Sequence, residues 1–171
     1  SHDPDVVLGQ ATLGVELAEQ LDRVDALVVA LGGGGLAAGV AGFLKSVNPK
    51  LFALAASPER SPVMVRSLAA GRLLELPSRP TLSDGTAGGV EPGAITFPLC
   101  QRLLDATATL SEAEIAEAMR AFMRVHPMLI EGAAGVAVAA LVQQRERFRG
   151  KNVAVVLCGA NIAPEALKAI L

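Results

Sequence analysis

Short apolar runs alternate with amphipathic segments along this chain. Ala26–Leu31 and Leu51–Ala56 are apolar at every position, which is typical of strands that are buried on both faces of a sheet. Val153–Leu157 repeats this pattern, and Thr107–Leu110 predicts a shorter strand. The segments between these runs carry apolar residues at helical spacing. The order predicts an α/β fold with three layers, in which a mostly parallel sheet has helices on both faces.

Helices are predicted from this spacing and from the residues that start and end helices. The expected ranges are Val6–Leu21, Leu36–Val47, Ser61–Gly71, Ile95–Leu104, Ser111–Arg124, Gly132–Gln143 and Pro164–Leu171. Ser111 and Glu114 have the spacing of a capping box. Asn161 and Pro164 are expected at the cap and the first turn of the last helix.

The segment Pro77–Gly93 differs from the rest because prolines and glycines interrupt its periodicity. A loop of this length inside a compact domain is usually functional. No repeat or linker divides the sequence, so we expect a single domain over residues 1–171. The chain opens on Ser1 in mid-pattern, without an initiator methionine, and we expect a fragment of a longer protein.

The run Gly32-Gly33-Gly34-Gly35 between a strand and a helix is the strongest chemical signal. Without side chains in the turn, backbone N–H groups can converge on an anion, and the helix that starts at Leu36 adds the positive end of its dipole. The alternative is a plain tight turn, for which one or two glycines would suffice. The run therefore favours a phosphate site.

The type of phosphate follows from what surrounds the glycines. Gly32-x-Gly34-x-x-Ala37 fits a dinucleotide fingerprint loosely, but the next strand ends at Ser57 without the acidic residue that holds a ribose. No Gly-Lys-Ser/Thr follows, which excludes a P-loop. A phosphate monoester fits better than a dinucleotide or a nucleoside triphosphate.

A second candidate segment, Cys158-Gly159-Ala160-Asn161, follows the last predicted strand. Parallel strands end at one edge of a sheet, where open α/β folds bind ligands, so Gly32 and Cys158 are expected to face one ligand. By itself, Cys158 is more typical of a small buried side chain than of a functional group. Gly159 and Asn161 are ordinary turn residues by composition.

Composition narrows the function classes. The net charge is -2 and aromatic residues make up 3% of the chain, so neither a basic surface for nucleic acid nor an aromatic stacking platform is expected. No apolar run approaches the ~20 residues of a membrane span. Cys100 and Cys158 form no disulfide framework and are expected to be free thiols, which favours a cytoplasmic protein.

Five blocks in this order carry a family resemblance: DPDVVLGQATLGVELAEQL, LGGGGLAAG, PTLSDGTAGGVEPGAITFPL, IEGAAGVAVAAL and VLCGANI. Together they resemble the C-terminal half of serine/threonine dehydratases and serine racemases, which are pyridoxal-phosphate-dependent enzymes of fold type II. The resemblance covers essentially the whole chain. It implies a lyase that removes water from a small hydroxy-amino acid and releases a 2-oxo acid and ammonia.

The resemblance also implies roles for individual residues. The cofactor-binding residues would be Gly32, Gly33, Gly34, Gly35, Leu36 and Cys158. The tetraglycine loop would bind the phosphate, and the Cys158 thiol would face the pyridine nitrogen. The cofactor or substrate pocket would include Gly85, Thr86, Glu131 and Gly159. A plainer interpretation of Glu131, which we weigh equally, is a carboxylate that stabilises the N-terminus of the next helix.

The chain departs from the family pattern at the catalytic lysine. The family's Schiff-base lysine belongs to a segment of the first half that is absent here. The lysines present are Lys45, Lys50, Lys151 and Lys168, and all of them are expected to be solvated surface charges. We therefore expect no catalytic residue in this chain and no lyase activity from it alone. The implied partners are the N-terminal half of the same protein and a second copy in a homodimer.

A metal site is not expected either. Many relatives have an acidic residue just before the proline that ends the second strand, and another acid further on. Ser57 and Val63 stand at these positions, and neither supplies the carboxylate oxygens that a hard cation prefers. Three further hypotheses remain: an amino-acid racemase fragment, a non-catalytic cofactor-binding module, and an NAD(P)-binding Rossmann protein, which the missing ribose-binding acid disfavours.

Overall fold

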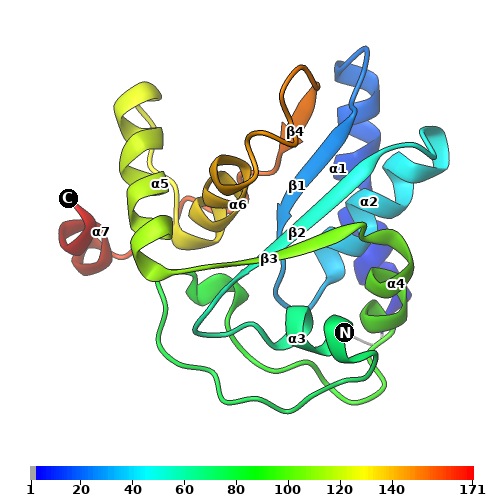
Figure 1. Cartoon of the computed structure of the whole chain (residues 1–171), viewed down its shortest axis with the longest axis horizontal. Helices are drawn as coiled ribbons and strands as arrows, with labels where there is room; N and C mark the ends of the chain where they lie inside the picture. The colour runs from blue at the N-terminus through cyan, green and yellow to red at the C-terminus, as the bar shows by residue number, and fades with distance from the viewer. Residues whose placement is uncertain (1–2) are drawn as a thin grey trace.

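A parallel sheet forms the centre of the molecule (Figure 1). The computed structural model describes residues 3–171, so Ser1 and His2 lie outside the described part. The strands are β1 (Ala26–Ala30), β2 (Phe52–Pro58), β3 (Ala106–Leu110) and β4 (Val153–Val155). Their order is β3-β2-β1-β4, and each neighbouring pair is parallel.

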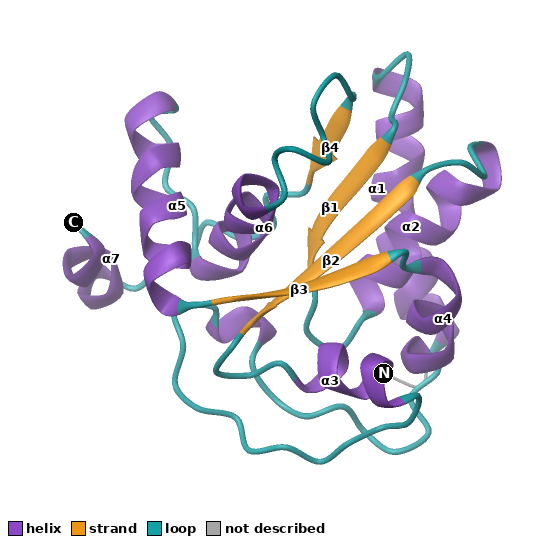
Figure 2. Ribbon diagram, viewed as in Figure 1, coloured by secondary structure: helices purple, strands orange, loops and turns teal. Residues whose placement is uncertain are grey.

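Helices cover both faces of this sheet, as Figure 2 shows. One face carries α1 (Pro4–Gln20), α2 (Gly35–Val47), α3 (Val63–Ala70) and α4 (Thr96–Leu103). The other face carries α5 (Glu112–Val125), α6 (Gly132–Gln143) and α7 (Pro164–Ile170). The three-layer α/β fold with a parallel sheet is therefore confirmed. Within residues 3–171, none of the helices has both the length and the hydropathy required to cross a membrane.

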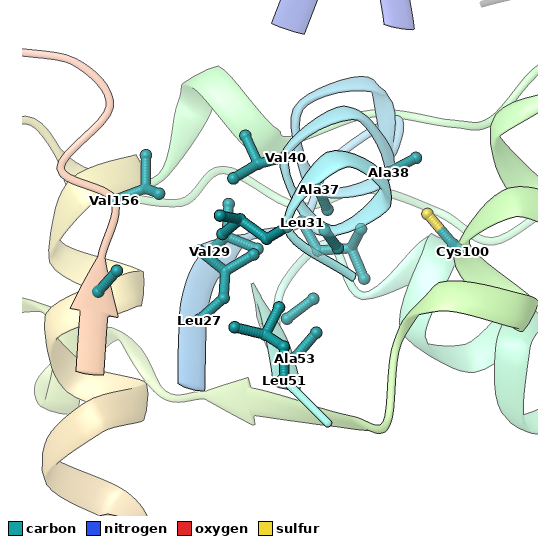
Figure 3. Packing of buried hydrophobic residues seen from close by; sticks show 14 of the residues in the cluster. Leu27, Val29, Leu31, Ala37, Ala38, Val40, Leu51, Ala53, Cys100 and Val156 are labelled. Atoms are coloured by element: carbon teal, nitrogen blue, oxygen red, sulfur yellow. The ribbon is translucent and has the colours of Figure 1, made fainter. Parts of the chain in front are cut away.

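Two hydrophobic cores explain why β1 is apolar at every position. Leu27 and Val29 of β1 face α2, whereas Val28 faces α6 on the other side of the sheet. Figure 3 shows the first of these cores, with the side chains of β1 packed against the helix that carries Ala37, Ala38 and Val40. The alanine-rich α6 is buried along most of its length, as expected of a core helix.

The strand and helix boundaries differ from the predicted ones in a few places. β2 runs on to Pro58 because β3 supplies a partner there, with Pro58 opposite Leu110. β4 is an edge strand that ends at Val155, although the Val156 N–H still donates to the Val28 carbonyl at 3.0 Å. The expected cap at Asn161 is wrong: the N-cap of α7 is Ala163, although Pro164 does occupy the first turn.

The strand order places the first strand beside the last one. From β1 the chain adds β2 and β3 on one side, and it then returns to add β4 on the other side. Ala26 of β1 lies opposite Val153 of β4. The C-terminal ends of β1 and β4 consequently lie side by side, at the point where the strand order reverses. Open α/β sheets bind ligands at such a point.

Candidate functional site

The glycine turn links β1 to α2 at this edge of the sheet. Gly34 is the N-cap of α2 and has a left-handed conformation with φ of 90°, which side chains rarely tolerate. A β-carbon built on Gly34 would also lie 2.8 Å from the Cys100 sulfur. Glycine is thus required at Gly34 for two independent reasons.

The turn presents an uninterrupted series of backbone donors. Among residues 3–171, no protein acceptor is hydrogen-bonded to the N–H groups of residues 32 to 37. The first N–H group with an acceptor is that of Ala38, which donates to the Gly34 carbonyl at 2.9 Å. Free N–H groups at a helix N-terminus, where the dipole is positive, form an anion-binding site.

Buried side chains support the turn from below. The Ser57 hydroxyl donates to the Leu31 carbonyl at 2.6 Å, and the Cys100 thiol donates to the Gly34 carbonyl at 3.7 Å. Burial raises the pKa of Cys100 to about 12, so the thiol keeps the proton that it donates. The Thr96 hydroxyl is also buried near Gly34 and has no hydrogen-bond partner among the described residues. Sequence reasoning did not predict that these three residues lie buried next to the turn.

The loop Pro77–Gly93 passes directly over the turn. It contains a short 3-10 helix, Asp84–Thr86, and the hydroxyls of Ser83 and Thr86 are hydrogen-bonded at 2.6 Å. A β-carbon built on Gly32 would lie 3.0 Å from the Thr86 Cα. The structure therefore brings Thr86 into contact with the glycine turn.

Glu131 joins this loop to the segment that follows β4. Its backbone N–H donates to the Gly159 carbonyl at 3.1 Å, and its carboxylate accepts the N–H of Asn161 at 3.1 Å. The side chain packs against Gly159 and lies next to Gly85. Glu131 is the N-cap of α6, but its side chain makes no capping hydrogen bond. The carboxylate instead faces a pocket of about 340 Å³ that Leu82, Asp84 and Asn161 also line.

Cys158 is in the segment that follows β4 and borders a different pocket from the one that Glu131 lines. It is exposed, so its interpretation as a small buried side chain is wrong. Cys158 and Gly159 border a groove of about 450 Å³ together with Leu36, which is in the first turn of α2. The groove is lined further by apolar residues of α1. The first turn of α2, through Leu36, and the segment after β4 thus border one groove, but none of the glycines from 32 to 35 lines it. That Gly32 and Cys158 face one ligand stays a prediction.

The lysines lie away from this edge. Lys50 and Lys151 precede β2 and β4, and Lys45 is in the last turn of α2, so these three lie where the strands begin. Lys168 is on α7. Lys45 is not the solvated charge that we expected, because it is 18% exposed and binds Asp105 at 2.7 Å. The turn and the groove receive no lysine from any of these elements.

Metal-binding side chains do not gather at this site. Among residues 3–171, no group of three or more histidine, cysteine or acidic residues is arranged to hold a metal ion. Ser57 and Val63 stand where many relatives have acidic residues. The Ser57 hydroxyl donates to the Leu31 carbonyl, and Val63 is buried in the N-terminal turn of α3.

Comparison with known proteins adds three findings. The family model of pyridoxal-phosphate dependent enzymes matches residues 1–159. An L-threonine ammonia-lyase of Thermotoga maritima is 39% identical over 161 residues, which cover 94% of this chain and 40% of that protein. The processed threonine deaminase isoform 2 of Solanum lycopersicum has a TM-score of 0.91 at 30% identity, covering 99% of this chain and 50% of that one.

Racemases are similar as well. The serine racemase of Dictyostelium discoideum has a TM-score of 0.85 at 30% identity, covering 95% of this chain and 52% of that one. The chain spans about half the length of the curated relatives that it matches.

Proposed function

The chain belongs to the family of pyridoxal-phosphate-dependent enzymes, and from this premise we propose that it is the phosphate-binding part of a serine/threonine dehydratase. The observation that carries the proposal is the series of free N–H groups from Gly32 to Ala37 at the start of α2. We call these N–H groups the phosphate cradle. A phosphate monoester fits the cradle because its oxygens accept several hydrogen bonds and its negative charge lies at the positive end of the helix dipole. Such an ester is the anionic group of pyridoxal phosphate.

We propose a separate role in cofactor binding for each of the residues around the cradle. Gly32 to Leu36 hold the phosphate, Thr86 and Gly85 limit the space above the ring, and Cys158 lies beside the ring. A thiol is a weak hydrogen-bond donor, so Cys158 leaves the pyridine nitrogen uncharged. Glu131 positions the Gly159 segment through its two hydrogen bonds. When bound, pyridoxal phosphate supplies the electron sink for carbanion chemistry at an amino acid.

The proposed reaction is the elimination of water from a small hydroxy-amino acid, followed by hydrolysis of the enamine to a 2-oxo acid and ammonia. The proton on the α-carbon has to be removed by a base, and the cofactor has to be held covalently by a lysine. The four lysines lie away from the glycine turn, so we propose that none of them fills either role. We therefore propose that the chain is one incomplete cofactor-binding domain that is inactive alone. Its proposed partners are a lysine-bearing segment, which corresponds to the half of the relatives that this chain does not match, and a second copy of the same protein in a homodimer.

Racemisation is the second candidate, because racemases match this chain about as well as the threonine enzymes do. Both reactions begin with loss of the α-proton. They differ in the acid or base that faces each side of the cofactor. The assembled enzyme would be assayed with L-serine for both 2-oxo acid and D-serine.

Phosphate binding can be tested with Gly33→Asp. Gly33 is exposed, and nothing lies within 4 Å of a β-carbon built there, so the change spares the fold and adds a carboxylate to the cradle. The probe is pyridoxamine phosphate, which has no aldehyde and cannot react with surface lysines; its binding is measured by titration calorimetry. We expect Gly33→Asp to weaken binding more than about tenfold through charge repulsion.

Gly9→Asp is the matched control. It makes the same charge change at another exposed glycine with open space around it, on α1. It should leave the dissociation constant unchanged. Equal weakening by both variants, or no binding of pyridoxamine phosphate by the unsubstituted chain, would contradict the proposal.

The position of the ring can be tested by alkylation of the two thiols. Iodoacetamide should react with the exposed Cys158 and spare the buried Cys100, because the thiolate is the reactive form and burial suppresses it. Pyridoxamine phosphate should slow the reaction of Cys158, as followed by mass spectrometry. If saturating pyridoxamine phosphate leaves the rate of Cys158 alkylation unchanged, the ring does not lie beside Cys158.

A further inference from the structure

Two buried serines lie at the end of β2, and their hydroxyls bond to the two segments that enclose the cradle. Ser57 and Ser61 are 1% and 2% exposed, and Pro58, which ends β2, lies between them. Buried hydroxyls of this kind are normally hydrogen-bonded, and their partners reveal what they hold in place.

Ser57 holds the glycine turn. Its hydroxyl donates to the Leu31 carbonyl at 2.6 Å, immediately before Gly32. The Leu31 N–H donates to the Ala56 carbonyl at 2.7 Å. Leu31 is therefore bound to β2 by both of its backbone polar groups, and the position at which the turn departs from the sheet is fixed.

Ser61 holds the loop that crosses the turn. Its hydroxyl oxygen accepts the N–H of Gly88 at 3.0 Å and the hydroxyl of Ser78 at 2.8 Å. Gly88 and Ser78 belong to the loop Pro77–Gly93, and Gly88 follows Thr86 closely. One buried hydroxyl thus binds the loop at two points on either side of the residue that touches Gly32.

We infer that Ser57 and Ser61 are positioning residues of the cofactor site, through which the end of β2 sets the distance between the glycine turn and the loop above it. Ser57 acts on the phosphate cradle, and Ser61 acts on the part of the loop that borders the ring. This assignment rests on the proposed function, since it concerns the same site.

The two roles predict different losses of affinity. Ser61→Ala frees the loop but leaves the cradle intact, so the dissociation constant of pyridoxamine phosphate should rise about tenfold while that of inorganic phosphate stays unchanged. Ser57→Ala disturbs the turn itself and should weaken both ligands. Titration calorimetry with each ligand measures the difference.

Ser67→Ala is the matched control. Ser67 is also fully buried, and its hydroxyl accepts the N–H of Leu74 at 3.0 Å, at the end of α3 away from the turn. This variant should lose stability to a similar extent and bind both ligands normally. If Ser61→Ala affects pyridoxamine phosphate no more than Ser67→Ala does, or weakens inorganic phosphate equally, the assignment of Ser61 is wrong.

Hydrogen exchange on the unsubstituted chain gives a test that needs no variant. Gly88 and Gly89 are both exposed, but only the Gly88 N–H has an acceptor among the described residues. The Gly88 amide should exchange more slowly than the Gly89 amide. Equal rates would mean that the Ser61 hydroxyl does not hold the loop at Gly88. Failure of the unsubstituted chain to bind pyridoxamine phosphate would instead remove the proposed function and this inference with it.

Discussion

At the scale of single residues, Cys100 illustrates how the core supports the candidate site. Its side chain is fully buried, lies under Gly34 and donates to the Gly34 carbonyl. Burial in apolar surroundings raises its pKa to about 12, because the thiolate would lose its hydration. The neutral thiol therefore serves as a small apolar side chain with one weak donor.

This raised pKa predicts a loss of stability in alkali. The unfolded chain ionises Cys100 near the ordinary value of 9.0, whereas the folded chain keeps it protonated. Between these two pKa values the unfolded state binds fewer protons, so the free energy of unfolding should fall as pH rises, by up to about 1.4 kcal/mol per pH unit. Denaturant unfolding at about pH 8 and about pH 10 measures this slope.

Cys100→Ala should show a shallower slope than the unsubstituted chain. Cys158→Ala should keep the original slope, since Cys158 is exposed. Identical slopes for all three proteins would mean that Cys100 ionises in the folded chain as readily as in the unfolded one.

The glycine turn was predictable from the sequence, because the run Gly32 to Gly35 between a strand and a helix contains more glycines than a plain turn requires. The buried hydroxyls around the turn were not predictable. Serine and threonine are usually exposed, so nothing in the local sequence distinguishes the buried Ser57, Ser61 and Thr96 from surface residues. Their burial results from the packing of β2, α3 and α4 around the turn.

At the scale of elements, α5 is the helix whose start the sequence defines best. The Ser111 hydroxyl accepts the N–H of Glu114 at 3.3 Å, and the Glu114 carboxylate accepts the N–H of Ser111 at 2.8 Å. These bonds confirm the predicted capping box. They also lower the pKa of Glu114, first through the Ser111 backbone N–H and then through the Ser111 hydroxyl.

Ser111→Ala should reduce the free energy of unfolding by about 1 kcal/mol, because the N-cap hydroxyl satisfies a free N–H of the helix. The contribution of Glu114 is present above its ordinary pKa and is lost as pH falls through the lowered one, so the variant's deficit should shrink in acid. Thermal and urea unfolding give the measurement. Ser46→Ala, which removes a helix hydroxyl that bonds to the Phe43 carbonyl and does not cap, should cost much less.

Element boundaries were less predictable where the partner strand decides them. The last two residues of β2, Ser57 and Pro58, pair with β3. The sequence around them has no pattern that predicts a strand. The predicted last strand runs two residues beyond the observed β4, which ends at Val155. The start of α1 was missed by two residues, although Asp3 caps it and Pro4 occupies its first turn, which are recognisable signals.

At the scale of the whole molecule, the side of the sheet beyond β4 is incompletely covered. β4 pairs with β1 only, Leu157 next to it is 40% exposed, and the apolar groove bordered by Leu36 and α1 lies alongside. Unpaired sheet edges with exposed apolar side chains favour association with other chains. We expect the proposed lysine-bearing segment to cover this side.

This chain alone should therefore self-associate through the β4 edge. Leu157→Lys places a charge there and should lower the weight-average mass measured by sedimentation at increasing protein concentration. Val47→Lys is the control, since Val47 is 59% exposed at the far end of α2. If the control lowers the mass equally, or if neither variant changes it, association does not involve the β4 edge.

The reversal of strand order also has a consequence for how the chain folds. Asp25 and Asn152, which join the starts of β1 and β4, are 127 positions apart, so this pairing closes the longest loop in the sheet and is entropically slow to form. The groove shared by Leu36 and Cys158 exists only once that closure is complete. A ligand that spans it would bind the finished fold alone and stabilise the latest contact by mass action. Binding would then report that the whole chain, from its first strand to its last, has folded.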